Sequence, residues 1–128
     1  MLTNAFASIE LGDAAAYAPY FRALPLHAAD YTFTNLWGWG PHYNLEWRTA
    51  HGLCWIRQKR SDLPVERLWA PVGDWNAVAW KDLLPCGFDV AEHSVTRVPE
   101  TLLHIWQRAL PGQVEGREDR GQWEYLYN

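Results

Sequence analysis

Hydrophobic and polar residues follow two periods along this chain, and the changes between them divide it into short elements. Alternation with period two is typical of half-buried strands. It predicts strands over residues 6–11, 43–47, 53–59, 67–70, 94–98, 113–117 and 122–127. Apolar residues at helical spacing predict two early helices, a third after residues 73–74 and a fourth over 99–110. The expected order is therefore β-α-α-β-β-β-α-β-α-β-β, in one domain over residues 1–128.

Capping and helix-breaking residues set the expected limits of the two early helices. Asp13 and Asp30 stand where N-caps are expected. Pro25 is expected to end the first helix, and Gly38 together with Gly40-Pro41 the second.

The second helix and the following hairpin each carry an expectation about packing. Phe33, Leu36 and Trp37 fall at i, i+3 and i+4, so we expect all three in the core. The Ala50-His51-Gly52 segment is expected to turn a hairpin.

Composition indicates a folded domain that is not a general nucleic-acid binder. The 128 residues are 48% hydrophobic and 20% charged, and they include nine Trp. Such a chain is long enough to bury a core. The net charge of −4 argues against non-specific attraction to phosphates. The basic cluster of Arg57, Lys59 and Arg60 is best interpreted as a solvated hairpin end.

Cysteine usage favours a reducing, cytoplasmic setting. Cys54 and Cys86 are the two cysteines, without a CxxC motif, a signal peptide or an apolar run that could span a bilayer. His51 and Cys54 have a metal-like spacing but lack a second ligand pair, so no metal site is expected. None of the five His residues adjoins a recognisable nucleophile motif.

Two segments at opposite ends of the chain resemble one known family. Residues 30–39 read DYTFTNLWGW and resemble the family's EYTFTNLF-W segment. Residues 118–127 read EDRGQWEYLY and resemble its EDR-x-x-x-[FW]-x-Y-x-Y segment. The family is that of the phosphatidylglycerol lysyltransferase C-terminal domain, whose members typically consist of two GNAT-like (acyltransferase-fold) halves. The resemblance implies an α+β, GNAT-like fold, with a twisted, mostly antiparallel sheet flanked by helices.

The resemblance also implies a function and partners. Complete relatives move an aminoacyl group from a charged transfer RNA onto the hydroxyl of phosphatidylglycerol. This chain corresponds to the N-terminal half, which we expect to be structural, to border the substrate and to be inactive alone. Its implied partners are a second GNAT-like half, from the same gene product or a second copy, and aminoacyl-tRNA.

The same two segments supply the candidates for a substrate groove. Tyr31, Asn35 and Trp39 lie in the first segment, and Glu118 and Asp119 in the second. For the charge-rich closing hairpin, acid–base work and a solvated or half-joining role both remain open.

A GNAT enzyme holds its cofactor pyrophosphate on the backbone amides of a glycine-rich turn between its fourth strand and third helix. Here the corresponding turn is Ala70 to Trp75, and it departs from the Q/R-x-x-G-x-G/A pattern. Pro71 lacks an amide donor and Asp74 adds a negative charge, so we expect neither coenzyme A nor any other cofactor. The alternatives are a stand-alone small-molecule N-acetyltransferase and a protein-interaction domain.

The last strand carries an expectation about assembly. Trp123, Tyr125 and Tyr127 alternate on one face of residues 122–127. A chain that ends on such a strand exposes an edge unless something pairs with it. We expect either a homodimer through this strand or its burial within the domain's own sheet.

Overall fold

The computed structural model describes residues 1–25, 29–58, 67–83, 94–109, 114–119 and 122–127. For residues 67, 82–83, 94, 114–119 and 122–127 it describes the backbone alone. The strands are β1 Ala7–Ser8, β2 Leu45–Ala50, β3 Leu53–Gln58, β4 Arg67–Trp69, β5 Ser94–Val98, β6 Val114–Asp119 and β7 Gln122–Tyr127. The helices are α1 Ala14–Ala23, α2 Phe33–Tyr43, α3 Trp80–Leu83 and α4 Glu100–Ala109, with 3₁₀ turns η1 Leu11–Asp13, η2 Ala29–Tyr31 and η3 Trp75–Ala77.

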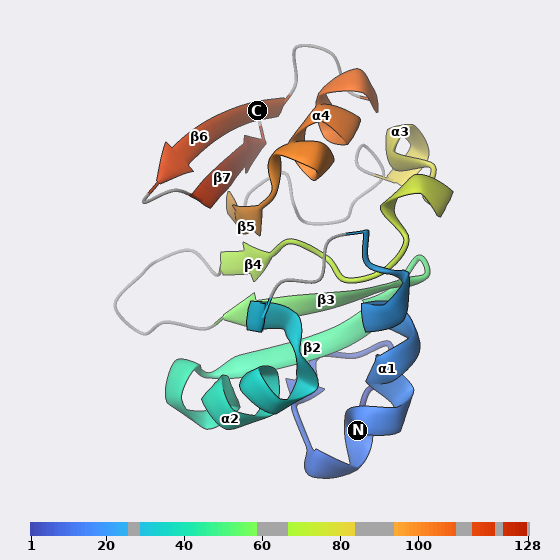
Figure 1. The fold of residues 1–128 in the computed structure, drawn as a ribbon, viewed down its shortest axis with the longest axis vertical. Helices are drawn as coiled ribbons and strands as arrows, with labels where there is room; N and C mark the ends of the chain where they lie inside the picture. Colours follow the sequence, from blue (N-terminus) through green and yellow to red (C-terminus); the bar gives the residue numbers. More distant parts are fainter. Residues whose placement is uncertain (26–28, 59–66, 84–93, 110–113, 120–121, 128) are drawn as a thin grey trace.

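The described strands form one sheet in the order β1-β2-β3-β4-β5-β7-β6. Neighbouring strands are antiparallel except for β4 and β5, which are parallel. In Figure 1 the helices α1 and α2 lie beside the β2–β3 half of this sheet, and α3 and α4 lie toward the β5–β7 half. The protein is thus α+β with a mixed, mostly antiparallel sheet, and the predicted order of elements is confirmed.

Tryptophan fills the space on both faces of the sheet. Side chains alternate along β3, yet both Trp55 and its neighbour Ile56 are fully buried, so helices cover both faces. Trp47 pairs with Ile56 and meets the Tyr17 ring of α1 at 5.0 Å between centroids. On the opposite face Trp55 meets Trp80 of α3 edge-on. Large aromatic rings bury much apolar area each, which lets so short a chain build a two-sided core.

The second helix differs from its prediction at both ends. Thr32, not Asp30, is the N-cap, and its hydroxyl accepts from the Asn35 amide at 3.4 Å. The helix also continues through Gly38 and Pro41. It stops at Asn44, which adopts a left-handed conformation with φ of 53°. Packing overrides the breakers, because α2 buries its inward face, on which Gly40 is buried near Ile9.

The prediction that Trp37 belongs to the core is wrong. Its side chain is 44% exposed, whereas Leu36 is fully buried. Leu36 and Gly40 define the inward face of α2, and Trp37 lies about 100° around the helix from Leu36. The i, i+3, i+4 pattern left open which side of the apolar stripe would meet the sheet.

Three other elements are shorter or more broken than predicted. β1 has two residues instead of the six expected over residues 6–11. The helix expected after residues 73–74 is divided into η3 and α3. Asp13 stands at the first helix as predicted, but its carboxylate accepts from the backbone amides of Leu2 and Glu10 instead of capping α1. Some predictions concern residues that the structure does not describe. They are those for Lys59, Arg60, Cys86 and Leu110.

The last strand is not an edge. β7 lies between β5 and β6 and pairs antiparallel with both. Of the two expectations for this strand, burial within the domain's own sheet is the one observed, and β7 offers a second copy no free edge. The side chains of Trp123, Tyr125 and Tyr127 lie outside the described residues.

Candidate functional site

The parallel pair β4–β5 marks where a ligand site is most expected in this sheet. β4 and β5 are the one pair of described neighbouring strands that run in the same direction, and ligands of open sheets typically bind outside the carboxyl ends of parallel strands. Leu68 pairs with Val95 and Trp69 with Thr96. The Ala70 amide then donates to the Thr96 carbonyl at 2.9 Å, so the two strands stay bonded to the end of β4.

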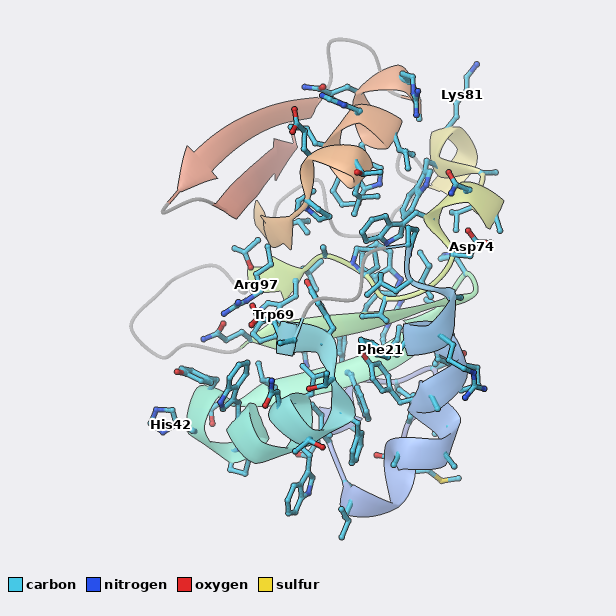
Figure 2. The ribbon with its side chains drawn as sticks, in the orientation of Figure 1. Phe21, His42, Trp69, Asp74, Lys81 and Arg97 are labelled. Atoms are coloured by element: carbon cyan, nitrogen blue, oxygen red, sulfur yellow. The ribbon has the colours of Figure 1, made fainter. Side chains whose placement is uncertain are left out.

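Four side chains gather at this point, and we call them the Arg97 cluster: Asp30, Tyr31, Trp69 and Arg97. The Arg97 guanidinium donates to the Asp30 carboxylate, and its central carbon lies 4.2 Å from the centre of the Trp69 ring. Tyr31 meets the same ring edge-on, with 6.0 Å between centroids. Figure 2 shows Arg97 and Trp69 together on one side of the molecule. The cluster joins the turn before α2 to the two parallel strands.

A break in β5 positions Arg97. The pairing of β5 with β7 shifts register between Val95 and Val98, which marks a β-bulge or similar irregularity. Within it Arg97 has a φ of 61°, in the left-handed region that residues other than glycine seldom adopt. Backbone strain of this kind amounts to about 1–3 kcal/mol and recurs at ligand and switch sites.

Tyr31 is the most enclosed member of the cluster. Its side chain is 6% exposed, and its carbonyl accepts from the Tyr17 hydroxyl. The Ala70 amide lies beside the Tyr31 hydroxyl but donates to Thr96, and within the described residues that hydroxyl has no hydrogen-bond partner. Burial raises the pKa of Tyr31 well above its usual value, while the nearby Arg97 charge opposes the rise. The phenol is therefore a neutral donor around neutral pH.

Two further groove candidates lie on α2. The Asn35 side chain donates to the Ala29 carbonyl at 2.7 Å and so braces the η2 turn against the helix start. Trp39 is half-buried against the core, one turn further along, and meets Tyr43 edge-on at 6.2 Å between ring centroids. The structure thus brings Asn35 next to the turn that carries Tyr31.

The remaining candidates, Glu118 and Asp119, lie at the end of β6, where they pair with Trp123 and Gln122 of β7. α2 contacts β2, and five strand-to-strand steps separate β2 from β6 in the sheet order. At about 4.8 Å a step, this is about 24 Å within the sheet. Glu118 and Asp119 therefore lie far from the strand that α2 contacts, whereas Tyr31 contacts Trp69 of β4, three steps from β6. The side chains of Glu118 and Asp119 lie outside the described residues.

Sequence reasoning missed Trp69 and Arg97, and gave Asp30 a capping role. Nothing in the pattern of residues 94–98 marks Arg97, because a bulge in a strand has no fixed sequence signal here. The Asp30–Arg97 contact joins residues 67 positions apart. The DYTFTN segment was the detectable signal, and it did lead to Asp30 and Tyr31.

The turn from Ala70 to Trp75 is closed by internal contacts. Val72 exchanges two backbone hydrogen bonds of 2.8 Å with Cys54, and the Pro71 carbonyl accepts from the Trp75 indole at 2.8 Å. The Asp74 carboxylate accepts from the Asn76 amide at 3.0 Å. Two amides that could face a phosphate, those of Ala70 and Val72, are thus committed, and Pro71 has none.

Gly73 in the same turn is required by packing. Its φ is 150°, and a Cβ added there would lie 2.6 Å from Leu53 Cδ2 and 3.2 Å from the Gly52 carbonyl oxygen. A glycine at this position is therefore explained by the close approach of the hairpin and needs no ligand.

Thiol and imidazole chemistry has little support in the described residues. Cys54 is fully buried, and burial raises the pKa of its thiol far above the ordinary value. His51 forms the hairpin turn with a φ of 56°. Among the residues with described side chains, no three His, Cys, Asp or Glu residues come together in a group that could hold a metal ion. None of the described helices has the length and apolarity needed to cross a membrane.

Comparisons with known proteins add a fold relationship. No family model matches the sequence, and no curated protein matches it. The fold is similar to that in the crystal structure of a conserved protein of unknown function from Bacteroides thetaiotaomicron VPI-5482, with a TM-score of 0.73 and 20% sequence identity. The match covers 90% of this chain and 39% of that chain. The same architecture therefore occurs as part of a chain more than twice as long.

Proposed function

We propose that this chain is a GNAT-like domain that serves as the non-catalytic, N-terminal half of an acyl- or aminoacyltransferase resembling the phosphatidylglycerol lysyltransferase C-terminal domain family. Three features support the GNAT-like part: the element order, the parallel pairing of β4 with β5, and the position of β7 between β5 and β6. The similar Bacteroides structure, of which this fold covers 39%, supports the idea of a longer whole.

The closed turn between β4 and η3 is the observation that carries the non-catalytic part. A pyrophosphate needs free amides at the start of a helix. Here the Val72 amide is committed to Cys54, Pro71 has none, and Asp74 puts a carboxylate at the turn. The helix that follows is also broken into η3 and α3, of three and four residues, which leaves little dipole to attract an anion.

In this proposal the domain borders the substrate without transferring the group itself. The Arg97 cluster and the η2 turn form its most structured polar surface near the parallel pair. The donor site, with the coenzyme A or aminoacyl-tRNA it would take, belongs to the second half. Glu118 and Asp119 at the far end of the sheet are then candidates for contacts with that half.

Calorimetric titration of this chain with acetyl-coenzyme A tests the proposal. We expect no saturable heat, with a competent small-molecule N-acetyltransferase run in parallel as the positive control. A stoichiometric complex would refute the proposal and favour the stand-alone N-acetyltransferase instead.

The reading frame beyond Asn128 provides a second, independent test. A following segment that folds as another GNAT-like unit is expected, and transfer activity should require that unit. A frame that ends at Asn128, together with concentration-dependent self-association in sedimentation, would favour an interaction domain.

A further inference from the structure

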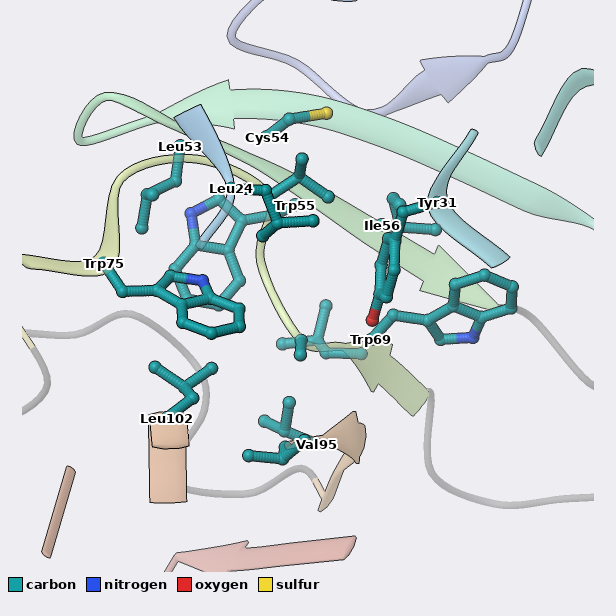
Figure 3. Packing of buried hydrophobic residues seen from close by; sticks show 14 of the residues in the cluster. Leu24, Tyr31, Leu53, Cys54, Trp55, Ile56, Trp69, Trp75, Val95 and Leu102 are labelled. Atoms are coloured by element: carbon teal, nitrogen blue, oxygen red, sulfur yellow. The ribbon is translucent and has the colours of Figure 1, made fainter. Parts of the chain in front are cut away.

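The η2 turn fills the carboxyl end of the parallel pair with one of its own side chains. In Figure 3 the Tyr31 ring lies beside Trp69, with its hydroxyl directed toward the end of β4. Tyr31 and Trp69 are both buried, and their rings meet edge-on. A position shaped for a phenol ring therefore lies at the carboxyl end of the parallel pair, and the chain itself occupies it.

Among the described residues, the contacts that hold this turn include the buried Tyr31 ring and an ion pair that water can reach. The Asp30 and Arg97 side chains are 33% and 29% exposed at their ion pair. The other contacts that hold the turn are hydrogen bonds to the Tyr31 and Ala29 carbonyls from Tyr17, Thr32 and Asn35. The turn is thus held by the buried Tyr31 ring, by one charged contact to β5 and by local hydrogen bonds.

Two features of the closed arrangement are energetically unfavourable. The Tyr31 hydroxyl is buried without a hydrogen-bond partner among the described residues, although buried hydroxyls are nearly always paired. Arg97 keeps a left-handed backbone that its side chain disfavours. Both features belong to the contact between η2 and β5. A contact selected only for stability would require neither of them.

We propose that η2 is a latch over a binding site for a flat aromatic or phenolic ring at the carboxyl end of β4–β5. Tyr31 occupies the site in the closed state, and the Asp30–Arg97 ion pair holds the latch. Opening withdraws Tyr31 and leaves a ring-sized space beside Trp69, with a polar end near Ala70. This inference goes beyond the proposed function and does not depend on the chain being half of a transferase.

Nitration of tyrosine by tetranitromethane, mapped by peptide mass spectrometry, tests the latch. The Asp30→Ala variant should react at Tyr31 about tenfold faster than the unmodified protein, the factor that one charge-assisted hydrogen bond contributes to an opening equilibrium. The exposed Tyr43 provides the internal reference for reagent activity.

The chain offers a matched control for the latch variant. Glu46 and Arg57 form an ion pair of 2.6 Å with side chains 24% and 19% exposed, and Arg57 likewise stacks over an aromatic ring, that of Phe6. Glu46→Ala should leave the nitration rate of Tyr31 unchanged. An unchanged rate in Asp30→Ala, or an equal increase in both variants, would overturn the latch.

Binding of phenol tests the site itself. Tyr31→Ala should gain thermal stability in millimolar phenol, whereas the unmodified protein and Tyr20→Ala should not. Tyr20 is a suitable control because it is partly buried and packs against the core from α1. A folded Tyr31→Ala variant that shows no phenol-dependent shift would overturn the binding site. If Tyr31→Ala does not fold, the same phenol titration of Asp30→Ala replaces it, and the absence of a phenol-dependent shift there would overturn the binding site.

Discussion

Replacing Gly73 by Ala separates the two reasons for which a glycine could stand in the β4–η3 turn. If the glycine allowed a phosphate to approach, a methyl group would weaken ligand binding and leave the fold intact. The structure indicates packing instead, because the added Cβ would lie 2.6 Å from Leu53 Cδ2 and 3.2 Å from the Gly52 oxygen. The change should therefore reduce the free energy of unfolding.

The magnitude has two parts. A side chain at φ of 150° is strained wherever its atoms lie, which amounts to about 1–3 kcal/mol. Displacing Leu53 from a closely packed position adds about 1–3 kcal/mol. The total of about 2–6 kcal/mol is a large share of the roughly 5–15 kcal/mol by which a domain is usually stable.

Urea unfolding followed by tryptophan fluorescence measures this loss, with Gly38→Ala as the control. Gly38 lies within α2 with nothing within 4 Å of an added Cβ, so alanine there should stabilise the domain by roughly 0.5–1 kcal/mol. Leu53→Val removes the clashing Cδ2, and the double variant Gly73→Ala/Leu53→Val should recover about 1 kcal/mol relative to the sum of the single changes. A Gly73→Ala variant as stable as the unmodified protein would refute the packing argument.

Two further predictions follow from burial. Trp37→Ala should change the free energy of unfolding by less than about 1 kcal/mol, whereas Trp55→Ala should reduce it by about 3–5 kcal/mol. Equal losses of the two variants in urea unfolding would contradict the conclusion that Trp37 lies on the exposed face of α2. Burial raises the pKa values of Tyr17, Tyr31 and Cys54 above their ordinary 10.0, 10.0 and 9.0, so the folded state keeps protons that the unfolded state loses. The free energy of unfolding should be constant up to about pH 9, the ordinary pKa of a thiol. Above that pH it should fall by about 1.4 kcal/mol per pH unit for each group that ionises only on unfolding. A free energy of unfolding that stays constant to pH 11 would show that these groups are not buried as described.

The sequence by itself determined the kinds of element and their order. The hairpin turn at His51-Gly52 and the strands β3, β4 and β5 lie where alternation and turn residues predicted them. These signals are local, since a turn needs positive φ at a few positions and a strand needs only its own alternation. The α+β class follows from that order.

Tertiary packing decided where the elements begin and end and which faces are buried. α2 passes through Gly38 and Pro41 because its inward face packs against the sheet, and the same packing leaves Trp37 outside. β7 became an inner strand because β6 pairs on its outer side.

The candidate site was least accessible to sequence reasoning. Asp30 and Arg97 are 67 positions apart in the sequence, and they meet at an irregularity of β5 that has no sequence signal. The sequence therefore suggested Tyr31 as a candidate but could not predict which residues surround it. Pro71 and Asp74 mark the Ala70–Trp75 turn as unfavourable for a phosphate from the sequence alone, whereas the bonds of Val72 to Cys54 that commit its amide became apparent only in the fold. Local rules act over a few residues, whereas contacts between distant segments depend on the register of the whole sheet.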